Sequence, residues 1–411
     1  MEFKIDEFES FVYAYRHAHG VAFAATGLQS SFGLFNPPFF IWLLSIPALF
    51  TTDPVLVTAF VAGVNVAGML LLYAFLKRAF SADTALWTTA LLSTAPWALL
   101  YSRKLWPQDV MIFFLVLFYW SLHSLMTRYR PSSVYLLFFS VAVLTQLHLI
   151  AWLIPLILIV FFDVFRVKIR RRDLVGGLLL FALLYAPYAF HQAQSSFGNL
   201  LDFLKESRGG LNSQDALEHL SWTVAATSGL KFSVQIGDEM YALFSSTYRL
   251  GIPTALFSAY AVGVVAGAAW LLQDALRKVR GWSHPSLLHP SDRILILLIA
   301  IWAVFTAVYI LIGAPPFTQY HIIFYPLAPL LLVLGLQKFL HALRQTQSRI
   351  PSVIIHTFLL LVVLSNLYFS ASFLHFLARN PEKIDAGYGK PYAVEQEEWE
   401  RKIEIVTGEE E

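Results

Sequence analysis

The chain has 411 residues and contains no cysteine. This absence excludes disulfide bonds, thiolate metal sites and cysteine nucleophiles. Charged residues are also scarce: they make up 14% of the sequence, against about 25% in globular domains. A secretory signal is not visible, because Glu9, Arg16 and His17 interrupt the first apolar-rich stretch.

Apolar residues fill most of the chain instead. Hydrophobic residues reach 57%, aromatic residues reach 16%, and the mean hydropathy is +0.61. Apolar runs of roughly 17 to 25 residues recur, each long enough to cross about 30 Å of hydrocarbon as a helix. The sequence therefore predicts an all-α polytopic membrane protein, with no nucleic-acid partner.

The first 53 residues are more polar and predict two amphipathic or interfacial helices outside the bilayer core. Apolar side chains recur at helical spacing over residues 7–19. A second apolar run opens at Asn36-Pro37-Pro38 and ends near Phe50, which is too short to span a membrane.

Ten membrane spans are predicted after this segment. Six form a first bundle within residues 54–190, and four form a second bundle within residues 251–377. Residues 191–250 form a large loop between the bundles, and residues 378–411 form an acidic tail. The ten spans cover residues 54–76, 84–100, 109–127, 132–147, 149–165, 174–190, 251–272, 294–314, 320–340 and 353–377.

The fourth and fifth spans form one apolar block with basic residues at both ends. Equal polarity at both ends requires an even number of crossings, so we expect a tight hairpin that turns near Gln146-Leu147-His148. A single long span is the competing interpretation.

The charges divide the span ends into two sets. One set, called here the basic end, holds 16 of the 29 basic residues and 5 of the 27 acidic ones. The other set, called the acidic end, contains the N-terminal segment, the 191–250 loop and the tail. The positive-inside rule predicts that the basic end is cytoplasmic and the acidic end extracytoplasmic, in a cell (inner or plasma) membrane.

Asp6 and Glu7 form an acidic pair at the start of the first amphipathic helix. Acids favour the first turn of a helix, so the pair fits an ordinary solvated helix start. It also fits a general base held at the membrane surface. Spacing alone leaves both interpretations open.

Other polar residues at the acidic end have two interpretations as well. Asn36 either belongs to a helix start or offers its amide to a substrate or metal. Arg103 and Lys104 are adjacent cations that suit a phosphate, and Asp109 is either a helix cap or a second acid. His148 and His321 are either packing residues or ligands. Lys205, Glu206 and Arg208 in the large loop are either a solvated face or a cover for a charged headgroup.

Taken in order, these motifs resemble one family. They are Asp6-Glu7, the Asn36-Pro37-Pro38 run to Trp42-Leu43, Tyr101-Ser102-Arg103 before Pro107-Gln108-Asp109, the Gln146-Leu147-His148 turn, and the Tyr320 to Leu330 segment. The chain is similar, over about residues 5–340, to the GT-C membrane glycosyltransferases related to the protein O-mannosyltransferases and the lipid A aminoarabinose transferase, a dolichyl-phosphate-mannose-protein mannosyltransferase-like group.

The resemblance implies a GT-C helix bundle with juxtamembrane helices. It also implies an inverting transfer of sugar from a polyprenyl-phosphate carrier to an acceptor at the extracytoplasmic face. Asp6 would be the general base, with Glu7 and Asp109 as further acids. Arg103 and Lys104 would neutralise the departing phosphate, with Asn36, His148 and His321 as further substrate-binding residues.

Three departures from the family pattern matter. Asn36 is a poor metal ligand where relatives carry His or Glu, so the metal is left unassigned, although a divalent ion stays possible. His321 stands where many relatives have a cation, and it could replace that charge only when protonated. The family also places a membrane span before the acidic pair, and we expect that this first helix is missing here.

The leading hypothesis is therefore a membrane glycosyltransferase, a hexosyl- or pentosyltransferase. The alternatives are a transporter or flippase of lipid-linked saccharides, or a catalytically inactive truncated relative. The acceptor is a lipid, a glycan or a protein.

Overall fold

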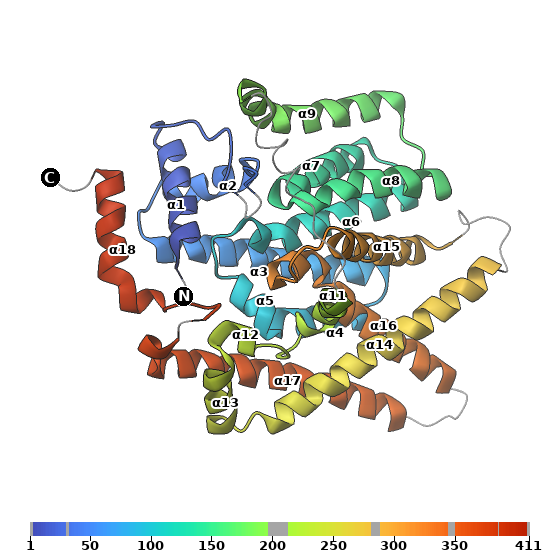
Figure 1. Cartoon of the computed structure of the whole chain (residues 1–411). Helices are drawn as coiled ribbons and strands as arrows, with labels where there is room; N and C mark the ends of the chain where they lie inside the picture. Colours follow the sequence, from blue (N-terminus) through green and yellow to red (C-terminus); the bar gives the residue numbers. More distant parts are fainter. Residues whose placement is uncertain are drawn as a thin grey trace.

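The computed structural model describes residues 3–29, 33–195, 213–280, 288–343, 350–384 and 386–408. Lys205, Glu206 and Arg208 lie outside these residues. Helices dominate the described ranges, and an isolated bridge between Gln29 and Phe35 is the only β pairing in them. The predicted all-α class is confirmed (Figure 1).

Two short helices precede the bundle, as the sequence predicts: α1 (Ile5–Ala18) and α2 (Phe39–Ala48). They pack against each other, and the Ser45 hydroxyl donates a hydrogen bond to the Ala14 carbonyl at 3.0 Å. The loop between them returns tightly, since a Cβ on Gly27 would lie 3.0 Å from the Pro37 carbonyl oxygen. A side chain on residue 27 would therefore crowd the Pro37 backbone, and glycine avoids this contact.

The first predicted bundle consists of α3 (Pro54–Ala79), α4 (Ala82–Thr94), α5 (Pro96–Tyr101), η1 (Pro107–Val110), α6 (Met111–Thr127), α7 (Pro131–Leu147), η2 (Leu149–Trp152), α8 (Leu153–Val164) and α9 (Arg171–Gln194). The large loop carries α11 (Ser213–Ala225), α12 (Ser233–Ile236) and α13 (Asp238–Thr247). The remaining elements are α14 (Gly251–Arg280), α15 (Pro290–Leu311), η4 (Thr318–Phe324), α16 (Leu327–Leu343), α17 (Ile350–Arg379), η6 (Pro381–Lys383) and α18 (Tyr392–Thr407).

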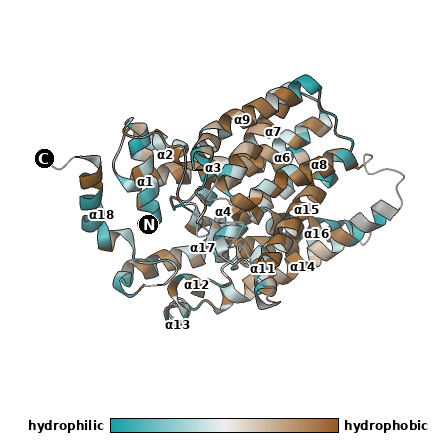
Figure 2. Cartoon of the chain, turned by 45° about the horizontal axis from the view of Figure 1, so that its top comes forward, coloured by the Kyte–Doolittle hydropathy of each residue, from teal (hydrophilic) through white to brown (hydrophobic). Residues whose placement is uncertain are grey.

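Six described helices are long and apolar enough to cross a membrane, and a seventh span results if the bent pair η4 and α16 is counted as one. Each of the ten predicted spans overlaps a helix, but the count of ten is not confirmed. The helix is interrupted where the hairpin was predicted to turn, because α7 ends at Leu147 and η2 begins at Leu149. The chain is a multi-pass membrane protein whose apolar residues run along the bundle helices (Figure 2).

Proline explains where predicted spans are broken. Residues 84–100 were expected as one span, but Ala95 has an extended ψ of 130° and separates α4 from α5. Proline disfavours the helical region for the residue before it, and Pro96 follows directly. Near Pro326, η4 and α16 likewise meet at a bend of 44°.

The predicted division of span ends is visible in the hydrogen bonds. At the basic end, Thr84 donates to Gln337 at 2.9 Å, and Tyr129 donates to Asp173. At the acidic end, the Trp97 indole donates to the Leu230 carbonyl at 3.0 Å. Each of these bonds joins two segments that the charge pattern assigns to the same end of the bundle. Which end faces the cytoplasm stays a prediction.

The C-terminal segment is a packed helix as well as an acidic tail. Phe3, just before α1, meets Tyr392 and Trp399 of α18 with ring centroids 5.6 and 5.4 Å apart. The Lys4 ammonium donates to the Gly387 carbonyl at 2.7 Å. Figure 1 shows α18 beside α1, so the first and last helices of the described chain pack together.

Candidate functional site

Buried charge identifies the region of interest. Four Asp, Glu, Lys or Arg side chains are buried among the described residues, and three of them belong to the predicted acidic end: Glu7 at 0%, Lys104 at 2% and Asp109 at 2% exposed. Charges are rarely buried without a specific role or partner. Two of the three lie on the short segment between α5 and α6.

Lys104 sits among aromatic rings. Its ammonium lies 5.0 Å from the Tyr101 ring centroid and 4.6 Å from that of Trp106. Aromatic faces stabilise a cation electrostatically. The neighbouring Arg103 is half-buried, and its Nε donates to the Leu99 carbonyl at 3.3 Å. The two predicted cations therefore differ: Lys104 faces inward and Arg103 is partly accessible.

Asp109 stands at the turn that brings the chain into α6. Its Oδ2 accepts a hydrogen bond from the Trp106 amide at 3.2 Å, which closes the start of η1. Both Asp109 and Tyr101 interact electrostatically with the Tyr325 hydroxyl. Tyr325 follows η4 directly, and η4 packs against η1. The fold thus joins residues more than two hundred positions apart.

We call Tyr101, Lys104, Trp106, Asp109 and Tyr325 the lysine cluster. Two donors in it are buried: the Trp106 indole N–H and the Tyr325 O–H make no hydrogen bond to any described residue. Such groups are costly unless something satisfies them. The cluster therefore combines a cation, one carboxylate and two donors, of which the cation and the donors suit an anionic oxygen-rich ligand.

Glu7 and Asp6, the predicted acidic pair, differ in their exposure and in their hydrogen bonds. Glu7 is buried and accepts a hydrogen bond from the Lys4 amide at 3.2 Å, which caps the first turn of α1. Asp6 is exposed, and it makes no hydrogen bond or ion pair to the described part of the chain. Its carboxylate can therefore meet a ligand from solution.

Asn36 is used locally. Its side-chain amide donates to the Leu28 carbonyl at 3.0 Å, and the backbones of the two residues are bonded as well. The residue thus fastens the loop between α1 and α2.

His148 and His321 meet in a second group, called here the histidine cluster: His148, His219, Tyr309, Tyr320 and His321. The Tyr309 hydroxyl lies 3.3 Å from Nε2 of His148 and 3.5 Å from the Tyr320 carbonyl oxygen. Burial lowers the pKa of His148 to about 4, so this imidazole is neutral at pH 7.

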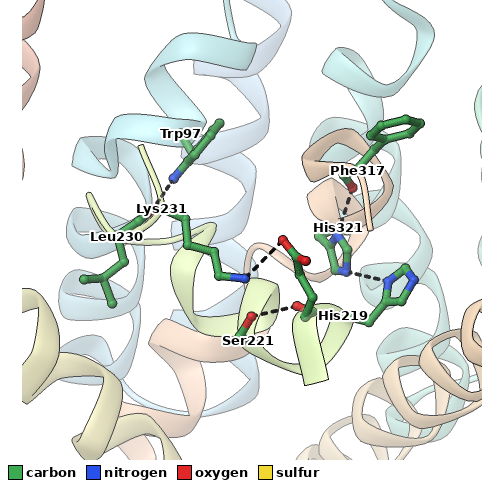
Figure 3. A network of polar contacts seen from close by, with 8 residues as sticks. Trp97, His219, Ser221, Leu230, Lys231, Phe317 and His321 are labelled. Atoms are coloured by element: carbon green, nitrogen blue, oxygen red, sulfur yellow. Dashed lines mark hydrogen bonds and ion pairs between the residues drawn. The ribbon is translucent and has the colours of Figure 1, made fainter. Parts of the chain in front are cut away.

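A chain of rings connects the two clusters. Tyr101 stacks on Trp97, Trp97 meets Trp222 edge-on at 5.1 Å, and Trp222 lies 6.2 Å from His321. Sequence reasoning missed Trp97, Trp222 and His219, because their neighbours come from other helices. Figure 3 shows this region with His219, His321 and Trp97.

A metal site of protein ligands is not seen in the described ranges, where no group of three or more His, Asp or Glu side chains could hold an ion. The lysine cluster also lacks a second carboxylate among its members. A cationic ammonium at its centre suits an anion better than a metal.

Comparison with known proteins concerns both family and fold. Residues 36–191 match the family model described as dolichyl-phosphate-mannose-protein mannosyltransferase. This match includes Arg103, Lys104 and Asp109, and it stops short of Asp6, Glu7 and His321. No curated protein sequence matches the chain.

Solved structures share the fold at low identity. The structure of ArnT from Cupriavidus metallidurans in the apo state aligns with a TM-score of 0.53 at 15% identity, over 91% of this chain and 71% of that chain. ArnT bound to undecaprenyl phosphate aligns with a TM-score of 0.50 at 13% identity, over 98% and 69%. AglB from Archaeoglobus fulgidus gives 0.49 at 14% identity, over 98% and 55%. The family-model match and the two ArnT structures confirm the predicted resemblance to the GT-C glycosyltransferases and the GT-C-type bundle.

Proposed function

We propose that the chain transfers a glycosyl group from a polyprenyl-phosphate carrier to an acceptor hydroxyl at the extracytoplasmic face. The observation that carries this proposal is the lysine cluster, where a buried ammonium is accompanied by two donors that no described residue satisfies. Undecaprenyl phosphate bound to ArnT, a protein of similar fold, is a ligand of this chemistry.

The reaction is a direct displacement. The acceptor oxygen forms a bond to the anomeric carbon, while the bond between that carbon and the phosphate oxygen breaks, and the electron pair leaves with the polyprenyl phosphate. Attack from the opposite side inverts the anomeric centre. Lys104 and Arg103 stabilise the charge that develops on the leaving phosphate.

Asp6 is the general base in this scheme. It lies at the acidic end, is exposed and is fixed by the first turn of α1, whose neighbouring Glu7 caps the helix. It takes the proton of the acceptor hydroxyl as the new bond forms. Such a base contributes about 10²–10⁴ in rate.

A transporter of lipid-linked saccharides is the second candidate. Ion-coupled transporters usually place ionisable residues near the middle of their spans. In the six long helices described here, Asp, Glu, Lys and Arg occur only near the ends. The distribution of charge therefore favours surface chemistry over transport.

The test uses membranes that contain the full chain, incubated with a panel of polyprenyl-phosphate hexoses and pentoses. Asp6→Asn should lower product formation by at least about a hundredfold, whereas the control Glu9→Gln, which changes an exposed acid of the same helix, should keep it. Equal activity of Asp6→Asn and wild type would exclude Asp6 as the base. Absence of transfer with every donor, together with saccharide transport, would favour the transporter.

A further inference from the structure

The fourth buried charge among the described residues, Asp173, lies at the basic end. Its carboxylate accepts a hydrogen bond from the Tyr129 hydroxyl, and the residue is 7% exposed. The same hydroxyl accepts a hydrogen bond of 3.2 Å from the Arg170 amide, and the Arg170 guanidinium lies 5.0 Å from the Tyr129 ring centroid. Tyr129 therefore fastens the turn between α6 and α7 to the segment that joins α8 to α9.

The two joined segments carry a concentration of positive charge. We call the basic patch the seven exposed cations on these segments and on the start of α9: Arg128, Arg130, Arg166, Lys168, Arg170, Arg171 and Arg172. Within the ranges that the structure describes, none of the seven forms an ion pair. Two acidic residues, Asp163 and Asp173, occur between residues 128 and 173, and Tyr129 already occupies Asp173. The patch therefore has a large excess of positive charge.

The segment between α8 and α9 presents its cations outward. Val167 and Ile169 are half-buried and pack against the core, whereas Arg166, Lys168 and Arg170, which alternate with them, are exposed. Arg166 has a φ of 53°, a left-handed backbone that glycine usually adopts at the end of a helix. The charge of Arg166 explains its presence at this position better than its backbone preference does.

Neither helix stability nor topology accounts for the whole patch. Cations stabilise the C-terminus of a helix and not its N-terminus, yet Arg171 and Arg172 are the first two residues of α9. The positive-inside rule asks for basic residues near the ends of spans. It does not ask for seven of them on two turns that a buried carboxylate and a tyrosine hold together. A ligand with negative charge would account for this arrangement.

Apolar side chains border the patch on both helices. Val160 and Val164 are exposed near the end of α8, and Val175 and Leu178 are exposed in the first turns of α9. In Figure 2, hydrophilic colour marks the segment that joins these two helices. The cations therefore lie directly beside surface that faces hydrocarbon. A ligand that matches both has an anionic head and an apolar chain, and an anionic phospholipid has this chemistry.

We propose that the basic patch binds the headgroup of an anionic phospholipid in the leaflet at the basic end. The lipid phosphate lies against the guanidinium and ammonium groups, which donate charge-assisted hydrogen bonds to it. The acyl chains lie along the exposed apolar faces of α8 and α9. The inference depends neither on the proposed transferase activity nor on which end of the bundle faces the cytoplasm.

The test is native mass spectrometry of the full chain in detergent, titrated separately with phosphatidylglycerol and with phosphatidylcholine of the same acyl chains. The wild type should bind phosphatidylglycerol more tightly. In the double variant Arg166→Gln with Lys168→Gln this preference should fall by about thirtyfold, because each basic residue near an anionic surface contributes a factor of about five. Both side chains are exposed, so the substitutions leave the packed core unchanged.

Two control variants separate the patch from the general charge of this end. Lys77→Gln with Arg78→Gln removes two exposed cations from the last turn of α3 and should keep most of the preference. Arg166→Lys with Lys168→Arg retains both charges and should bind phosphatidylglycerol nearly as the wild type does. An equal loss in the α3 variant and in the patch variant would overturn the proposal, since the attraction would then belong to the whole surface.

A measurement on the wild type needs no variant. Phenylglyoxal modifies accessible arginines, and it should react more slowly with Arg166 and Arg172 in nanodiscs that contain phosphatidylglycerol than in nanodiscs of phosphatidylcholine alone. Arg78 should react at similar rates in both. Equal reactivity of Arg166 and Arg172 in the two kinds of nanodisc would overturn the proposal. So would displacement of phosphatidylglycerol by inorganic phosphate, because the patch would then be a site for a soluble anion.

Discussion

The junction of α18 with α1 offers a sharp test of the fold, and Trp399 is the residue to change. Trp399 is 6% exposed, and its ring lies 5.4 Å from the rings of both Phe3 and Phe8. Tyr392 and Ile403 are the other buried residues of α18. Trp399→Ala therefore removes the central apolar contact of a small interface.

The expected effect follows from these contacts. Replacing a buried Trp by Ala costs about 3–5 kcal/mol, and each aromatic pair contributes about 0.5–1.5 kcal/mol beyond its buried area. A loss of 3 kcal/mol raises the equilibrium for opening by about a hundredfold. Because α18 makes few other contacts, we expect it to leave α1 while the membrane bundle stays folded.

Hydrogen exchange of residues 392–407 in detergent measures this opening. Trp399→Ala should lower their protection by about a hundredfold, and Trp399→Phe, which keeps an aromatic ring, should have a much smaller effect. Ile405→Ala is the control, because Ile405 lies on the same helix and is 58% exposed. Unchanged protection in Trp399→Ala would refute the reasoning, since it would mean that these rings do not hold α18.

Three further predictions address the site, the charge state and the packing. Lys104→Met keeps an apolar stem against Tyr101 and Trp106 but removes the ammonium, so the rate of transfer from a polyprenyl-phosphate sugar should fall by a factor of about 10²–10³. The control Lys231→Met should retain most of the activity. Equal rates for Lys104→Met and wild type would contradict the phosphate role of Lys104. Burial lowers the pKa of His148 to about 4, so the contribution of this residue to stability is present above about pH 6.5 and is lost as the pH falls toward 4. Melting curves of His148→Gln should therefore show less acid sensitivity than those of the wild type, by up to about 3 kcal/mol. Identical pH profiles of the two proteins would count against this prediction. A Cβ on Gly335 would lie 2.5 Å from the Gly267 Cα, so Gly335→Val should separate α14 from α16 and lower the melting temperature. In the control Gly63→Val nothing lies within 4 Å of the added Cβ, so the melting temperature should stay nearly unchanged.

Hydropathy predicted where helices occur, because apolar length is a local property of the sequence. It did not predict their continuity. Pro96 breaks residues 84–100 into α4 and α5, and Pro326 lies between η4 and α16. Both prolines were visible in the sequence, and the rule for the residue before proline accounts for the first break.

The site was predictable only in part. Lys104 and Asp109 are only five positions apart, on either side of Pro107, so the sequence already showed that they belong to one short segment. Tyr325 and His219 reach the same region from distant helices, and no local spacing could reveal them. The docking of α18 was missed for a related reason: Tyr392, Trp399 and Ile403 form its buried face, but they are dispersed in an acidic stretch.

The burial of charge at the acidic end argues for function over stability. Taking a charged group out of water costs several kcal/mol, and well-packed apolar residues of similar size are often as stable or more so. Lys104 and Asp109 nevertheless lie at 2% exposure beside the unsatisfied Trp106 and Tyr325 donors. An apolar set of side chains would hold this junction of η1 and η4 at lower cost. The two unsatisfied donors are the part of this set that the phosphate of the proposed sugar carrier would complete.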